Sequence, residues 1–206
     1  MWQERLNEFV TLLVVVNPIG ALPTFLHTAG RFDLPTQRGI ALKAVLASAA
    51  VLLFFMVGGG FLLEKIGVSL KAFQIAGGIV LFVFALEAVR GQAFGTVQPG
   101  GKAGPAAIAI YPIAIPKIAG PGTMLTVVLV TDDRRFDFAQ LWMTALVLAI
   151  VLAITFAVLL AAGPLSRLLG ESGASVIARV MGMVLAALAV TMVLGGLSAW
   201  LGLPRI

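Results

Sequence analysis

Six long apolar segments run through this sequence and restrict it to one class of fold. They cover roughly residues 6–28, 38–63, 71–90, 105–131, 138–162 and 174–201. A helix needs about 20 mostly apolar residues to cross the hydrocarbon core of a bilayer, and every segment reaches that length. Only 11% of the 206 residues are charged, whereas a soluble domain is about a quarter charged. The pattern predicts an all-α polytopic membrane protein with six transmembrane helices, folded as a single membrane domain over residues 1–206.

The residue types that carry most metal and cofactor chemistry are scarce. The chain has no cysteine, one histidine (His27) and nine acidic residues. Thiol chemistry and disulfides are therefore excluded, and we expect no metal site and no cofactor. The net charge of +5 comes from basic residues in short loops, where they would face lipid headgroups. We expect the lipid bilayer, and no nucleic acid, as the partner of these charges.

The chain contains a weak internal repeat. Shifting residues 73–89 by 104 positions aligns them with residues 177–193 and places Gly78 on Gly182. The same offset, within one residue, superimposes further expected helix breakers: Pro18 with Pro121, Gly59 with Gly163, and Gly67 with Gly170. We therefore predict a three-helix repeat over 1–90, a linker over 91–104 and a second repeat over 105–206. Because three spans are an odd number, the repeats would be inverted, as in many secondary transporters.

The first span of each predicted repeat carries helix breakers. In the first repeat they are Asn17-Pro18-Ile19-Gly20 and Pro23, and in the second they fill the stretch from Tyr111 to Thr123. Proline frees backbone groups inside a helix, and lipid cannot satisfy them, so such a break must be buried in protein or line a wet cavity. Its free N–H groups attract anions and its free C=O groups attract cations. A zwitterion matches both poles, while a plain kink that serves packing stays open as the alternative.

Several other classes of protein lack their sequence signatures. The chain has neither His-Glu-x-x-His nor Gly-x-Ser-x-Gly, so we do not expect an enzyme. It also lacks a Walker phosphate loop, which excludes ATP as the direct driver of transport. An ion gradient, of Na+ or H+, is the expected source of work. A channel, or a structural or regulatory membrane protein without transport activity, stays open.

Three stretches resemble a known family. Asn-Pro-Ile-Gly-Ala-Leu-Pro-Thr-Phe in the first span, Ile-Ala-Gly-Gly-Ile-Val-Leu-Phe in the third and Pro-Ile-Ala-Ile-Pro-Lys-Ile-Ala-Gly-Pro-Gly-Thr-Met in the fourth resemble the MarC family of bacterial inner-membrane proteins. That resemblance implies a relation to the LysE group of exporters and cation-coupled transport of neutral amino acids. The motif residues carried over are Asn17, Pro18, Gly20, Pro23, Pro112, Pro116, Gly120, Pro121, Gly122 and Thr123. Lys117 departs from the family pattern, which has an apolar residue there.

These observations predict a carrier of small neutral amino acids, such as alanine or glycine, in symport with Na+ or H+. The substrate would bind near the membrane midplane between the two broken helices. The predicted substrate-binding residues are Asn17, Pro18, Gly20, Thr24, Lys117, Gly120, Pro121, Gly122 and Thr123. An exporter of other small metabolites is the alternative. The direction of transport, the coupling ion and the formation of a homo-oligomer stay open.

The remaining charged residues fit the ends of the spans. Glu87 is expected at headgroup level beside Arg90, and Asp132-Asp133-Arg134-Arg135 is expected to form a solvated loop. Basic residues are nearly balanced between alternate loops, so they do not fix the orientation of the chain. The family resemblance implies that both termini lie outside the cytoplasm and that the linker lies inside, with the protein in the bacterial inner membrane.

Overall fold

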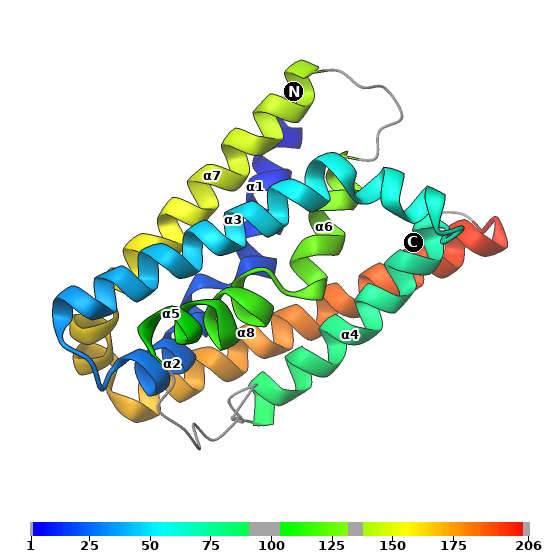
Figure 1. Ribbon diagram of the computed structural model, residues 1–206. Helices are drawn as coiled ribbons and strands as arrows, with labels where there is room; N and C mark the ends of the chain where they lie inside the picture. Colours follow the sequence, from blue (N-terminus) through cyan, green and yellow to red (C-terminus); the bar gives the residue numbers. More distant parts are fainter. Residues whose placement is uncertain (1, 91–103, 132–137, 204–206) are drawn as a thin grey trace.

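The computed structural model describes residues 2–90, 104–131 and 138–203, and this part of the chain is helical throughout apart from short connections. Figure 1 shows long helices running side by side and crossing at shallow angles. The elements are α1 (Trp2–Val16), α2 (Pro18–Ala29), α3 (Leu34–Lys65), α4 (Leu70–Arg90), α5 (Pro105–Ile108), η1 (Ala109–Ile118), α6 (Pro121–Thr131), α7 (Phe138–Leu160) and α8 (Ala162–Leu201).

Among the described residues, five helices have the length and hydropathy to cross a membrane, and a bent pair of helices makes a sixth candidate span, as the sequence predicted. They are Trp2–Ala29, Leu34–Lys65, Leu70–Arg90, the bent pair Pro105–Ile118 with Pro121–Thr131, Gln140–Leu160 and Ser175–Leu201. The bent pair turns through 55° at its break. The predicted linker over 91–104, apart from Gly104, and the predicted loop over 132–135 lie outside the described residues.

Three of the expected helix breakers do not break a helix. Gly163 and Gly170 lie within α8, which is separated from α7 by the single residue Ala161 and runs unbroken for 40 residues. Gly59 likewise lies inside α3. A single glycine destabilises a helix by only about 1 kcal/mol relative to alanine. A helix formed by the neighbouring residues can therefore continue past it. Gly67, by contrast, has a φ of 73° just after the end of α3, where a left-handed residue closes the helix.

Prolines mark where helices begin. Pro18, Pro105 and Pro121 are the first residues of α2, α5 and α6, and Pro35 lies in the first turn of α3. Proline is tolerated there because a helix leaves its first N–H groups without intrahelical acceptors in any case. Pro18 and Pro121 therefore interrupt a long span and at the same time start the helix that follows the break.

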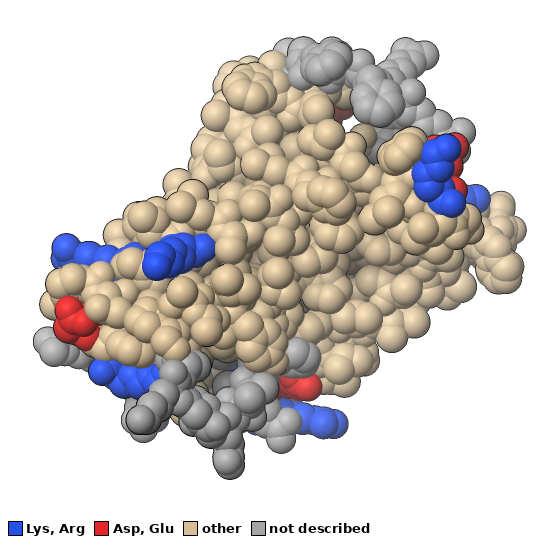
Figure 2. Space-filling view, in the orientation of Figure 1, with Lys and Arg blue, Asp and Glu red and all other residues tan. Residues whose placement is uncertain are grey.

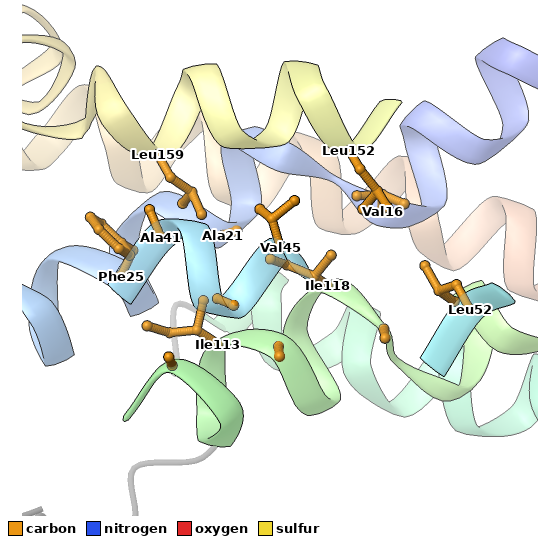
Figure 3. Packing of buried hydrophobic residues seen from close by; sticks show 14 of the residues in the cluster. Val16, Ala21, Phe25, Ala41, Val45, Leu52, Ile113, Ile118, Leu152 and Leu159 are labelled. Atoms are coloured by element: carbon orange, nitrogen blue, oxygen red, sulfur yellow. The ribbon is translucent and has the colours of Figure 1, made fainter. Parts of the chain in front are cut away.

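The buried side chains form two clusters. The larger joins α1, α2, α3, η1 and α7, with Phe25, Leu52, Ile113 and Leu159 among its most buried members (Figure 3). The smaller joins α4, α6 and α8 around Leu81, Leu125 and Ala189. The broken spans α1–α2 and η1–α6 contribute to the large cluster, so the interrupted segments lie inside the bundle.

The outer surface of the described helices carries many large apolar side chains. Large exposed side chains occur on every long helix, for example Phe54 on α3, Val83 on α4, Leu146 on α7 and Met183 on α8. Figure 2 shows that Lys, Arg, Asp and Glu gather towards two opposite ends of the visible face, with an uncharged region between them. Such a band is what a bilayer-spanning bundle presents to lipid.

Candidate functional site

The first break lies at Asn17, between α1 and α2. Asn17 has φ 49° and ψ 67°, the left-handed conformation that asparagine tolerates better than most residues. Its Oδ1 accepts a hydrogen bond of 2.9 Å from the backbone N–H of Gly20, so it caps the first turn of α2. The residue is only 4% exposed. Among the described residues no hydrogen bond runs from its Nδ2 group to an acceptor.

Gly20 has no side chain because the Asn17 amide occupies that space. A Cβ placed on Gly20 would lie 2.6 Å from Asn17 Cγ and closer still to Nδ2. Pro18 is the first residue of α2 and is also buried. Thr24, in the second turn of α2, is buried as well. Asn17 and Gly20 thus pack against each other at the start of α2, with Pro18 as the first residue of that helix.

The second broken span is more irregular than the first. Within η1, Tyr111 and Ile115 have extended backbone conformations, and each precedes a proline joined by a cis peptide bond. Proline disfavours the α conformation in the residue before it, which accounts for both interruptions. A further break at Ala119 and Gly120 separates η1 from α6. The sequence predicted one break in this span, whereas the structure has three interruptions.

Thr123 and two glycines, Gly120 and Gly122, shape the break before α6. Thr123, 2% exposed, donates a 3.0 Å hydrogen bond from Oγ1 to the carbonyl of Ile118, the last residue of η1. A Cβ on Gly120 would lie 2.5 Å from the carbonyl oxygen of Pro116. A Cβ on Gly122 would lie 2.7 Å from Leu81 Cδ1 on α4. Both glycines are therefore required by close approaches, whereas the intervening Pro121 starts α6 and is half-buried.

The structure brings the two broken spans into contact. α1 packs against α6, and α2 packs against η1. The first-turn N–H groups of α2 and α6 and the last carbonyls of α1 and η1 have no intrahelical partners. Ser48 of α3 lies beside this region, because its Oγ, fully buried, donates to Ala44 O at 2.8 Å and approaches Ala114 O of η1 at 3.4 Å. Sequence reasoning missed Ser48, since one serine in an apolar span carries no distinctive signal.

Lys117 lies in the last turn of η1 and is half-buried. The carboxylate of Glu87, near the end of α4, is close enough to act electrostatically on it. The sequence assigned Glu87 to a headgroup-level pairing with Arg90. The structure adds a relation to Lys117 in the second broken span, and a carboxylate there offsets part of the cost of placing a cation inside a membrane protein.

Sequence reasoning also missed Glu8. It is 8% exposed on α1, and its Oε2 accepts a 2.6 Å hydrogen bond from Arg5 Nη1. Arg5 Nη1 also contacts Thr144 Oγ1 of α7 at 3.2 Å. The signal was available in the spacing, because Glu8, Leu12, Val15 and Val16 recur at helical intervals and form the buried face of α1.

This geometry defines a class of protein: a multi-pass helical membrane protein with two contacting spans that are broken at buried proline- and glycine-containing sequences. The family profile described as MarC family integral membrane protein matches residues 2–201. The chain belongs to the MarC family, as the sequence motifs predicted.

Relatives match over nearly the whole chain. A UPF0056 membrane protein of Methanocaldococcus jannaschii is 34% identical over 95% of this chain and 96% of its own length. A UPF0056 membrane protein of Archaeoglobus fulgidus is 33% identical over 93% and 91%. The UPF0056 inner membrane protein YhgN of Escherichia coli is 32% identical over 96% and 98%. No solved structure matches the chain.

Proposed function

We propose that this protein is a secondary transporter of small neutral amino acids, such as alanine or glycine, driven by a Na+ or H+ gradient. The observation that carries the proposal is the contact between two spans that are each broken at a buried site. The E. coli relative is named an inner membrane protein, and we place this chain in the corresponding bacterial membrane. In this proposal the substrate binds between the α1–α2 break and the η1–α6 break.

The two breaks offer opposite electrostatic poles. The buried N-terminus of α6, with Gly122 and Thr123 in its first turn, presents N–H groups that suit a carboxylate. The carbonyls that end α1 and η1 suit an ammonium group. A small amino acid carries both charges a few ångströms apart. The glycines of the second break keep side chains out of the space next to the backbone, which favours a small substrate.

Reciprocal packing supports an inverted-repeat carrier. The first span of the first repeat, α1–α2, contacts α7, the second helix of the other repeat. In the same way η1 and α6 contact α3, and the third helices α4 and α8 pack against each other. A pseudo-two-fold relation between three-helix repeats would produce this exchange of partners. The two repeats could then rock against each other around a site between the breaks.

Asn17 and Thr123 do not have equal roles in this proposal. The Thr123 hydroxyl proton is used to satisfy the Ile118 carbonyl, so Thr123 acts mainly by shaping the break. Asn17 uses Oδ1 as a cap and retains Nδ2 as a donor. We therefore assign direct substrate contact to Asn17 Nδ2 and to backbone groups. The capping bonds also favour a second candidate, a membrane protein without transport activity in which both side chains serve folding only.

Uptake by reconstituted protein separates these candidates. Purified protein in liposomes would be tested with labelled alanine and glycine, under Na+ and proton gradients applied separately. The key variant is Asn17→Asp, which keeps the capping oxygen and removes the Nδ2 donor. Thr28→Val is the matched control, because Thr28 Oγ1 bonds to Thr24 O within α2.

The carrier proposal expects saturable, gradient-driven uptake by the wild type and by Thr28→Val. Uptake should fall by at least tenfold in Asn17→Asp while its melting temperature in detergent stays close to that of the wild type. No uptake by folded wild-type protein under either gradient would contradict the proposal and support the non-transporting candidate. Full uptake by Asn17→Asp would remove Asn17 from the substrate site.

A further inference from the structure

We propose that Glu8 binds the coupling proton of the transport cycle, at its carboxylate atom Oε1. This inference rests on the proposed function, and it chooses the proton over Na+ as the coupling ion. It assigns a role to a buried acidic group that lies in α1 well away from the helix break. The argument uses the hydrogen bonds of Glu8, its position on α1 and the charges around it.

One oxygen of the Glu8 carboxylate is satisfied and the other is not. Oε2 accepts the 2.6 Å bond from Arg5 Nη1, whereas Oε1 is buried without a hydrogen-bond partner. The Glu8 side chain is 6% exposed and that of Arg5 is 28% exposed. Burying an acceptor without a partner is unfavourable, and more so when the acceptor is charged. Proton binding at Oε1 removes the charge that makes this arrangement costly.

Glu8 lies on the inner face of α1, which leads to the helix break. Glu8, Leu12, Val15 and Val16 are the buried residues of this helix. At a rise of 1.5 Å per residue, Glu8 lies about 14 Å along the helix axis from Asn17. That separation places Glu8 outside the substrate site but on the same broken span, so its protonation can be coupled to movement of that span.

Arg5 connects Glu8 to the neighbouring repeat. Its Nη1 donates both to Glu8 Oε2 and to Thr144 Oγ1 of α7, a helix that packs along α1. When a proton from water adds to Oε1, the carboxylate becomes a neutral carboxylic acid and Arg5 keeps its positive charge. The bond to Arg5 is then no longer between two ions, so the Coulomb attraction between their opposite charges is lost. Protonation therefore holds Arg5 less firmly in the position from which it donates to Thr144 of α7.

The surroundings favour a proton over a metal cation. In the described part of the chain, Glu8 does not belong to a cluster of three or more His, Cys, Asp or Glu side chains that could hold a metal ion. The guanidinium of Arg5 also repels a second cation at the same carboxylate. A proton needs only the one free acceptor atom, Oε1.

Few other charges can act on Glu8 from the helices that pack on α1. The described residues of α6 and α7 contain no Asp, Glu, Lys, Arg or His. On α8 the charged residues are Arg179, which is exposed, and Arg167 and Glu171, whose side chains lie outside the described part. Glu4 and Arg5 are the charged neighbours on α1 itself. The remaining charges of this region belong to the segment 132–137, outside the described residues: Asp132, Asp133, Arg134, Arg135 and Asp137.

The test compares two modes of transport by the same liposomes. Counterflow of labelled alanine against unlabelled alanine needs substrate binding and movement, but no net proton transfer. Accumulation against a gradient needs the proton. We expect Glu8→Gln to retain counterflow and to lose proton-driven accumulation, down to the level measured without a gradient. Glu64→Gln, which changes an exposed carboxylate at the end of α3, should behave as the wild type in both assays.

Several results would overturn the proposal. Proton-driven accumulation by Glu8→Gln at the wild-type level would do so, as would accumulation by the wild type that depends on Na+ and not on protons. If Glu8→Gln also loses counterflow, Glu8→Asp decides the question. This variant keeps a carboxylate and must recover both counterflow and at least part of the proton-driven accumulation, and failure to recover them would overturn the proposal.

A spectroscopic readout keeps this inference separate from the transporter proposal. If the wild type shows no counterflow, the proposed function fails but Glu8 can still be tested. Infrared difference spectra between acidic and alkaline pH should contain the C=O stretch of a buried protonated carboxyl in the wild type and in Glu64→Gln. The band should be absent in Glu8→Gln. Identical spectra from all three proteins would overturn the proton site itself.

Discussion

Gly78 of α4 and Gly182 of α8 make the same close approach to each other's helix. A Cβ on Gly78 would lie 3.0 Å from the carbonyl oxygen of Ala189, and a Cβ on Gly182 would lie 3.0 Å from that of Ala85. The offset of 104 positions that aligns Gly78 with Gly182 also aligns Ala85 with Ala189. The two glycines therefore exchange equivalent partners across the contact between α4 and α8.

Replacing either glycine by alanine should destabilise the protein. The nearest atoms include backbone atoms, such as Val89 N at 2.9 Å from a Cβ on Gly182, and these cannot rotate away. Overpacking of this kind costs typically about 1–3 kcal/mol. We expect Gly78→Ala and Gly182→Ala to unfold at lower temperature than the wild type in detergent, as measured by circular dichroism.

The matched control for these variants is Gly39→Ala in α3. A Cβ on Gly39 would meet no atom within 4 Å, so the change should gain helix propensity of up to about 1 kcal/mol. Similar losses of stability for Gly39→Ala and Gly182→Ala would mean that close helix packing is not what the glycines provide.

The Asn17–Gly20 unit should show strong coupling in a double-mutant cycle. Gly20→Ala places a methyl group against the Asn17 amide, and Asn17→Ala removes both that amide and the cap, at a cost of about 1 kcal/mol. Once the amide is absent, the methyl group has room. We expect the double variant to lose less unfolding free energy than the sum of the single losses, by at least about 0.5 kcal/mol.

The measurement is the free energy of unfolding of the four proteins in the same detergent. Additive losses would show that the Gly20 methyl group is obstructed by something other than Asn17. The capping bond to Gly20 N would then not explain why the residue is glycine.

The spans were predictable because lipid imposes one rule on every helix that crosses it. Apolar residues must face the hydrocarbon and backbone groups must be paired within the segment, so the six apolar runs gave the positions of the spans within a few residues. The start of α8 was not predictable in this way. Its first residues are more polar, and polarity marks where a span ends, whereas the helix itself continues from Ala162.

The site was predictable only in part. Proline chemistry located the breaks at Asn17-Pro18 and before Pro121, since proline cannot continue a preceding helix normally. The side-chain roles depended on tertiary contacts that the sequence does not display. Asn17 bonds to Gly20 N, Thr123 bonds to Ile118 O, and Glu8 is buried beside Arg5 and α7. Each of these contacts forms only because the folded backbone or a neighbouring helix brings the two groups together.

The hydroxyl group of Thr123 should contribute more to the stability of the protein than that of its neighbour Thr126. Both are buried, but Thr123 bonds across the break to Ile118 O, whereas Thr126 bonds within α6 to Gly122 O at 2.8 Å. Replacement by valine leaves the Ile118 carbonyl without its Thr123 partner in the first case, at a cost of about 1–3 kcal/mol. In the second case the Gly122 carbonyl loses only the bond from the threonine hydroxyl and still accepts its backbone hydrogen bond within the helix.

Thermal unfolding of Thr123→Val and Thr126→Val provides the comparison, with Thr123→Ser as a variant that restores the hydroxyl. We expect Thr123→Val to melt clearly below Thr126→Val and Thr123→Ser to recover most of the difference. Equal melting temperatures for the two valine variants would show that the bond across the break adds no stability beyond that of an ordinary helical threonine.

Lys117 and Glu87 should be energetically coupled. Lys117 is half-buried in η1 and lies within the field of the Glu87 carboxylate. Removing one charge leaves the other uncompensated in a poorly solvated place, whereas removing both does not. We expect Lys117→Gln and Glu87→Gln each to lower the free energy of unfolding, and the double variant to lose less than their sum by about 0.5–3 kcal/mol. Lys65→Gln, at the exposed end of α3, should show no coupling with Glu87→Gln. Additivity of the Lys117 and Glu87 losses in detergent-solubilised protein would mean that the two charges act independently.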